Sequence, residues 1–172
     1  MAKKLVIKPL KLHPQLPATF EADNLVRLRD AVRAVQLAAP VACSLETLYR
    51  AVEDLCLHKL APQLYVQLQQ ECDRHASARL AELASWAGLD AAAFLDHLRR
   101  CWQHYCSQLL LIRQIFLYLD RTYVVTNSAA RSLFDMGLQL FRSHLAEHPE
   151  VGGLLAPGAA QLWHVCSFCV DA

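Results

Sequence analysis

The sequence feature that most constrains the fold is a helical pattern of about 35 residues, which begins near Asp90 and ends near Val125. Its second half is apolar on nearly every side, with apolar residues at positions 109–112, 115–119 and 123–125. A helix that is apolar all round has to be covered all round. A chain of 172 residues can cover only part of it, whether the pattern is one rod or two helices bent around residues 106–108. The sequence therefore predicts a surface that another protein covers.

Local signals predict four more helices and favour the all-α class. Apolar spacing, N-cap residues and prolines place these helices at about residues 20–37, 44–59, 62–86 and 128–144. The expected N-terminal signals include Thr19, Ser44 and the pair Asn127–Ser128. The chain has only 5 glycines, so many short strands joined by glycine turns are not expected.

The helix that begins at Ser44 carries two adjoining apolar rows. One row consists of Leu48, Val52 and Leu55. The other row consists of Leu45, Tyr49 and Cys56. One row is enough for an ordinary amphipathic helix, so the second row predicts burial over a wide arc, against either this core or another chain.

The two ends of the chain differ from the helical body. Three prolines exclude a helix over residues 1–18, which are either a frayed terminus or an extended arm that docks on a partner. Paired Gly and Pro signals without apolar periodicity predict an irregular tail over residues 149–172. The expected architecture is thus a bundle of five helices over residues 19–148 between these two segments.

Charge and cysteine content exclude several classes of protein. A net charge of +1 gives no overall indication of nucleic-acid binding. The 7 cysteines are irregularly spaced and no signal peptide precedes them, which favours free thiols in a reducing compartment. The longest apolar run is interrupted by Arg113 and Gln114 and is too short for a membrane span of ~20 residues. We expect Arg113, Asp120 and Arg121 to be solvated charges or the rim of a binding surface.

Two groups of residues have the spacing of partial metal sites. They are Cys166-x-x-Cys169 with His164, and the helical set His97, Cys101 and His104. Neither group supplies the four tetrahedral ligands that zinc prefers, so we assign no metal and no cofactor. No nucleophile elbow, phosphate loop or HExxH motif occurs, and we assign no catalytic residue. The alternative is a metal-binding protein or a thiol enzyme that uses Cys101, Cys106, Cys166 or Cys169.

Several long motifs resemble the first repeat of the cullin family. They are RCWQHYC at 100–106, IRQIFLYLDRTYV at 112–124 and FDMGLQLFR at 134–142. KKLVIK at 3–8 and LETLYRAVEDLC at 45–56 are similar to the cullin-4 branch in particular. The resemblance covers about residues 3–146 in the correct order. It implies an all-α cullin repeat that serves as a non-catalytic scaffold of a ubiquitin ligase in the nucleus and cytoplasm.

The resemblance also implies a partner and a set of contact residues. In cullin-4 the partner is a triple-propeller adaptor, damaged-DNA-binding protein 1, which carries substrate receptors. Two helices and the N-terminal arm would contact it, and direct contacts with nucleic acid or membrane are not expected. The residues carried over by position are Leu45, Glu46, Tyr49 and Glu53 from one helix, Tyr118, Arg121 and Thr122 from the other, and Leu5, Val6 and Ile7 from the arm.

The sequence departs from the family after His148. The further helical repeats, the RING-binding domain and the lysine that takes a ubiquitin-like modifier are missing from residues 149–172. We therefore expect a chain that binds an adaptor but no RING protein, and that is not a competent ligase alone. A decoy that sequesters the adaptor is an alternative with the same binding and the opposite biological effect.

Overall fold

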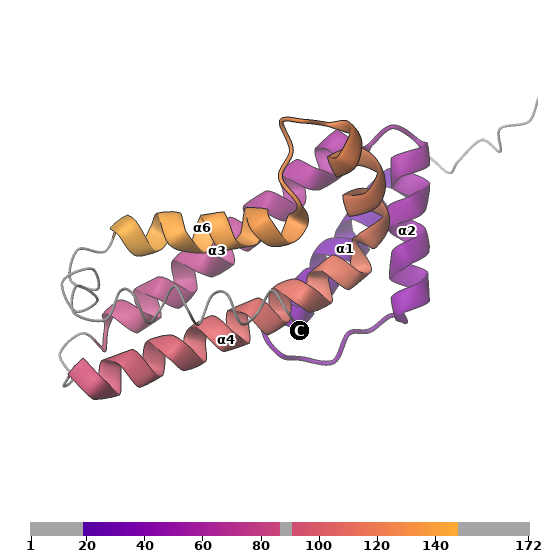
Figure 1. The fold of residues 1–172 in the computed structure, drawn as a ribbon. Coiled ribbons are helices and arrows are strands. Elements are labelled where there is room, and N and C mark those ends of the chain that lie inside the picture. Colours follow the sequence, from indigo (N-terminus) through magenta and orange to yellow (C-terminus); the bar gives the residue numbers. More distant parts are fainter. Residues whose placement is uncertain (1–18, 87–90, 148–172) are drawn as a thin grey trace, which may run out of the picture.

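The computed structural model describes residues 19–86 and 91–147, and these residues are mostly helical (Figure 1). No strand occurs within the two described ranges, in agreement with the predicted all-α class. The elements in chain order are α1 (Phe20–Gln36), α2 (Leu45–Leu57), α3 (Ala61–Ala84), α4 (Ala91–Ile115), α5 (Leu117–Leu119), the π-helical segment η1 (Asp120–Val124) and α6 (Leu133–Glu147).

The helices form two connected halves. The long helices α3 and α4 extend away from α2, and α6 packs on both of them (Figure 1). We call α3, α4 and α6 the helical body. At the other end of α4, α2 lies beside α5 and η1, with α1 packed behind them against α2, α3 and α4.

One continuous apolar core joins the two halves, from Leu28 on α1 to Phe141 on α6. In the helical body the Phe141 ring lies 5.1 Å from the Trp102 ring and 4.9 Å from the Tyr105 ring, measured between centroids. The Tyr105 hydroxyl donates a hydrogen bond of 3.0 Å to the carbonyl oxygen of Gly137. A Cβ atom at Gly137 would lie 2.5 Å from Leu109 Cδ2, so glycine allows α4 and α6 to approach this closely.

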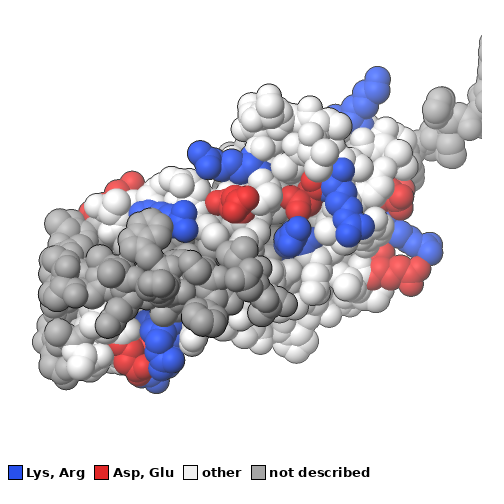
Figure 2. Space-filling model, viewed as in Figure 1, with Lys and Arg blue, Asp and Glu red and all other residues white. Residues whose placement is uncertain are grey.

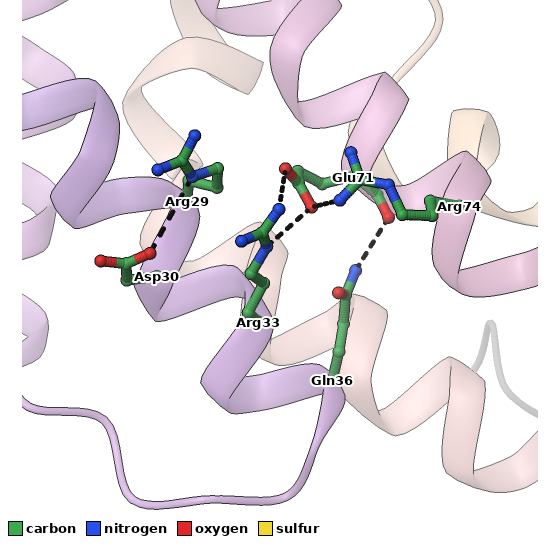
Figure 3. Close-up of polar contacts among 6 residues, drawn as sticks. All are labelled: Arg29, Asp30, Arg33, Gln36, Glu71 and Arg74. Carbon is green, nitrogen blue, oxygen red and sulfur yellow. Dashed lines mark hydrogen bonds and ion pairs between the residues drawn. The ribbon is translucent and has the colours of Figure 1, made fainter. Parts of the chain in front are cut away.

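A polar network fixes α1 against α3 (Figure 3). The buried Glu71 carboxylate accepts two hydrogen bonds of 3.2 Å from the Arg33 guanidinium and a third, of 2.9 Å, from Arg74. Gln36 donates to the Glu71 carbonyl oxygen and accepts at its own carbonyl from Gln108 of α4. A buried carboxylate is tolerated because every partner it needs is present, and the network thereby sets the relative position of the three helices.

The helix starts show which local signals decide structure. The Ser44 hydroxyl accepts a hydrogen bond of 3.2 Å from the Thr47 amide, which confirms it as the N-cap of α2. The prediction that a helix starts after Asn127–Ser128 is wrong, because Asn127 Oδ1 instead accepts from the Ala129 amide and closes a turn. The N-terminus of α6 is capped by Ser132, whose hydroxyl accepts from the Asp135 amide at 3.1 Å.

The long apolar pattern is neither one rod nor a pair of helices bent around residues 106–108. The α-helical dihedrals continue through that region and fail at Phe116, where φ is −96° and ψ is 20°. Phe116 is almost fully buried, so core packing rather than a local helix breaker stops α4. Among the described helices, none combines the length and the apolar character that crossing a membrane requires.

Candidate functional site

The two apolar rows of α2 have different environments. Leu48, Val52 and Leu55 are almost fully buried in the core. In the second row, Leu45 is 50% exposed, and Tyr49 and Cys56 are half-buried. Within the described chain, the core therefore covers only one of the rows, and the second remains partly open to solvent.

α2 packs against α5, and the structure places the predicted residues Tyr49 and Tyr118 side by side. We use the name α2–η1 face for the seven predicted residues of α2, α5 and η1: Leu45, Glu46, Tyr49, Glu53, Tyr118, Arg121 and Thr122. The Tyr49 and Tyr118 rings meet edge to face, with centroids 6.1 Å apart and planes at 88°. Tyr118 is half-buried like Tyr49, so each ring covers part of the other and leaves the rest accessible.

The charges of the face are arranged around the tyrosine pair. On α2, Glu46 accepts a hydrogen bond of 2.6 Å from Arg50, and both side chains are exposed. Neither Glu53 on α2 nor the exposed Arg121 on η1 forms an ion pair with any residue in the described ranges. The α2 side of the face thus carries the Glu46–Arg50 pair and the carboxylate of Glu53, and the η1 side carries the guanidinium of Arg121. Over the surface that Figure 2 draws, basic and acidic side chains are interspersed.

The π-helical segment η1 shapes the second half of the face. Threonine hydroxyls donate hydrogen bonds to backbone carbonyl oxygens along this part of the chain. Thr122 donates to the carbonyl oxygen of Tyr118 at 2.6 Å, and Thr126 donates to that of Thr122 at 2.8 Å. The Cys56 thiol of α2 faces Thr122, and burial raises the pKa of this thiol to about 11. π-Helical turns are rare in proteins, but those that do occur are often found at functional sites. There they change the direction in which side chains point.

Asp120 connects η1 to the helical body, and the sequence analysis missed this role. One carboxylate oxygen accepts from Arg113 Nε at 3.1 Å and the other accepts from the Leu133 amide at 2.9 Å. The side chain is only 8% exposed, so the expectation of a solvated charge is wrong for Asp120. The spacing of Arg113 and Asp120 gave no such signal, because residues seven apart on an unbroken helix lie about two turns apart and this ion pair forms across the break at Phe116.

The remaining sequence candidates lie elsewhere. Leu5, Val6 and Ile7, and the set His164, Cys166 and Cys169, are outside the described residues. His97, Cys101 and His104 line an open cleft of about 350 Å³ between α3 and α4, where the His97 ring lies against the Trp86 ring with centroids 4.5 Å apart and planes tilted by 31°. No group of three or more potential ligands among the described His, Cys, Asp and Glu residues is placed to hold a metal ion.

Burial makes Cys72 and Cys101 poor nucleophiles, as it does Cys56. None of the five described cysteines forms a disulfide. Burial raises the pKa of Cys101, and it raises the pKa of Cys72 to about 12. A thiol with a raised pKa is protonated at neutral pH and is a poor nucleophile, so these positions do not favour a thiol enzyme.

The part of the chain that matches known proteins includes both the α2 residues and the α5–η1 residues of the face. A family model described as the cullin alpha solenoid domain matches residues 25–161. Human cullin-4A is 47% identical over 144 residues, and mouse cullin-4A is 45% identical over the same length; each alignment covers 84% of this chain and 19% of the relative. Cullin-4 of Dictyostelium discoideum is 36% identical over 149 residues, which is 85% of this chain and 19% of that protein. The chain therefore spans about a fifth of the length of these relatives.

Proposed function

This chain belongs to the cullin family, and on that premise we propose that its α2–η1 face docks a triple-propeller adaptor of the damaged-DNA-binding protein 1 type. The adaptor would bring substrate receptors to the chain. Within a ubiquitin ligase the chain would act as a non-catalytic scaffold. The similarity to cullin-4A of human and mouse supports the choice of this adaptor class.

The observation that carries the proposal is the half-buried tyrosine pair, which Tyr49 of the second α2 row forms with Tyr118. Tyr49 and Tyr118 come from different helices and meet edge to face, and Leu45 beside them is 50% exposed. Tyrosine is enriched among the residues that dominate binding energy, because it offers a large area with few torsions and a hydrogen-bonding tip. A central aromatic and apolar cluster is what a protein interface of standard size requires.

The charges around the pair favour a partner with a defined polarity. Glu46 and Glu53 lie on α2, and Arg121 lies on η1. Because Glu46 is paired with Arg50, the complementary surface would carry a basic group opposite Glu53 and an acidic group opposite Arg121. Such rim charges contribute more to orientation and association rate than to affinity.

The N-terminal arm is a second proposed contact. Leu5, Val6 and Ile7 lie outside the described residues, and their assignment rests on the similarity of KKLVIK to the cullin-4 branch. An extended segment of this kind adds affinity through an additional site on the same partner.

The direct test is calorimetric titration of the purified chain with the purified adaptor. We expect a one-to-one complex for the wild-type chain. Leu45→Arg places a charge on the face, one helical turn before Tyr49, without disturbing the core, because Leu45 is half exposed. We expect this variant to lose at least about tenfold in affinity, since an unpaired charge at an interface core is costly.

Trp86→Arg is the matched control. Trp86 is 43% exposed and follows α3 at the end of the helical body farthest from α2 (Figure 1). This variant introduces the same charge at an exposed apolar position outside the face, and we expect the wild-type affinity. Equal affinities for Leu45→Arg and the wild type, at equal circular dichroism, would exclude the α2–η1 face as the docking site.

A further inference from the structure

We infer that Asp120 is the positioning residue of the α2–η1 face, because it fixes the turn that carries Tyr118, Arg121 and Thr122; this inference rests on the docking function proposed above. Asp120 faces away from the proposed partner, since its side chain is 8% exposed. Its effect on docking would therefore pass through its neighbours on the chain.

Both oxygens of this carboxylate are used by different elements. Arg113 lies on α4, before the helix break at Phe116, and Asp120 lies after the break. The Arg113–Asp120 ion pair, with Nε and Oδ2 3.1 Å apart, thus spans the break. The other oxygen accepts from the amide of Leu133, the first residue of α6, at 2.9 Å.

The contact with α6 is favourable for two reasons. The first amides of a helix have no partner within the helix, and the helix dipole makes this end positive. A buried carboxylate needs such donors because it has lost its hydration. Asp120 therefore holds η1 to α4 on one side and to α6 on the other.

The face residues are direct neighbours of this anchor. Tyr118 is two residues before Asp120, and Arg121 and Thr122 follow it. The Thr122 hydroxyl bonds to the Tyr118 carbonyl, so the two sides of the turn move together. A rotation of η1 together with the adjoining α5 would separate the Tyr118 ring from Tyr49, which lies on α2 and is not held by Asp120.

Glu71 provides a matched control for a purely stabilising role. It is a buried carboxylate with 7% exposure, and it pairs with Arg33 and Arg74. Its contacts hold α1 to α3 and include no residue of the α2–η1 face. Asp120→Asn and Glu71→Gln each remove one buried charge and keep the size of the side chain.

The test measures amide hydrogen exchange of the full chain without any partner. We expect Asp120→Asn to exchange about tenfold faster than the wild type over residues 117–125, because local opening follows the loss of a charge-assisted hydrogen bond. For Glu71→Gln we expect faster amide exchange in α1 and α3. Over residues 117–125 this variant should exchange at the wild-type rate. If Asp120→Asn does not fold, Arg113→Gln tests the same contact. This variant removes only the exposed partner of the ion pair, and we expect a smaller increase in hydrogen exchange over the same segment.

Adaptor affinity then tests the consequence for docking. Tyr118→Ala should weaken binding less in the Asp120→Asn background than in the wild type, because the ring is already displaced there. Strictly additive losses, or unchanged exchange over residues 117–125 in both Asp120→Asn and Arg113→Gln, would overturn the inference. If the wild-type chain does not bind the adaptor, the proposed function fails and the exchange pattern alone decides the role of Asp120.

Discussion

Tyr105 and Tyr118 belong to the same long helical pattern of the sequence, yet their surroundings are opposite. Tyr105, in the helical body, is 1% exposed, packs on Phe141 and donates its hydroxyl proton to the Gly137 carbonyl. Tyr118, on the α2–η1 face, is half-buried, and its described ring contact is with Tyr49. The helical body buries the Tyr105 ring and satisfies its hydroxyl, whereas the face keeps part of the Tyr118 ring accessible. The comparison separates residues that serve folding from residues that are free to serve binding.

Phe141→Ala should destabilise the helical body and have the largest effect of the predicted substitutions. The ring is almost fully buried between Trp102 and Tyr105, so truncation leaves a cavity. We expect the free energy of unfolding to fall by about 3–5 kcal/mol. Urea denaturation followed by circular dichroism measures this change. A loss below about 1 kcal/mol would mean that the aromatic cluster is not packed as described.

Replacing both Tyr49 and Tyr118 by alanine should weaken docking at the α2–η1 face and leave the helical body folded. We expect adaptor binding to weaken by about 2–4 kcal/mol, because these rings are the proposed anchors. The free energy of unfolding should fall by less than about 2 kcal/mol, since both side chains are only half-buried. Calorimetric titration and urea denaturation of the same preparation measure the two quantities. A stability loss equal to that of Phe141→Ala would assign the pair to the core instead.

Two helix caps allow a finer comparison between the halves. Ser44→Ala and Ser132→Ala each remove an N-cap hydroxyl, at α2 and α6 respectively. Both should cost about 1 kcal/mol of stability. Only Ser44→Ala should also weaken adaptor binding, because Leu45 and Glu46 occupy the first turn of α2. Equal affinities for the two variants would show that the start of α2 does not contribute to docking.

The smallest expected effect is a dependence on pH in the helical body. His144 Nε2 lies 2.8 Å from Asp73 Oδ1 and its Nδ1 lies 3.2 Å from Glu147 Oε2. Partial burial opposes the charged ring, but the hydrogen bonds to these two carboxylates outweigh it and raise the pKa of His144 above its ordinary 6.5. The stabilisation by protonated His144 is then complete below pH 6.5 and is lost as the pH rises through the raised value.

Thermal unfolding of the wild type and of His144→Gln across pH 5.5 to 9 tests this effect. The difference between their Tm values should be largest at the acidic end and should shrink as the pH rises. The comparison with the variant removes the contributions of all other titrating groups. A difference that grows with pH would contradict the predicted direction.

Local sequence signals predicted much of the fold and, on the α2 side of the face, the second apolar row with Leu45 and Tyr49. The row Leu48, Val52 and Leu55 is buried as its spacing indicates, and Ser44 caps α2. Tyr49 and Tyr118 were chosen from resemblance, and the structure places their rings together. Their role in docking stays a prediction. The helix break at Phe116 was missed because no residue near it is a strong helix breaker. The start of α6 at Leu133 was missed because the expected cap was Asn127–Ser128, whereas Ser132 caps the helix.

The sequence by itself determined where apolar residues exceed what one helix face can use, because helical periodicity depends only on neighbours three and four positions apart. The tertiary structure alone decided which of those residues stay exposed and where the long pattern ends. Those outcomes depend on contacts between distant positions: Asp120 with the Leu133 amide, Gln108 with Gln36, and the Tyr65 hydroxyl with the backbone of Arg131. Such partners come together only when the helices pack, so no local pattern in the chain specifies them.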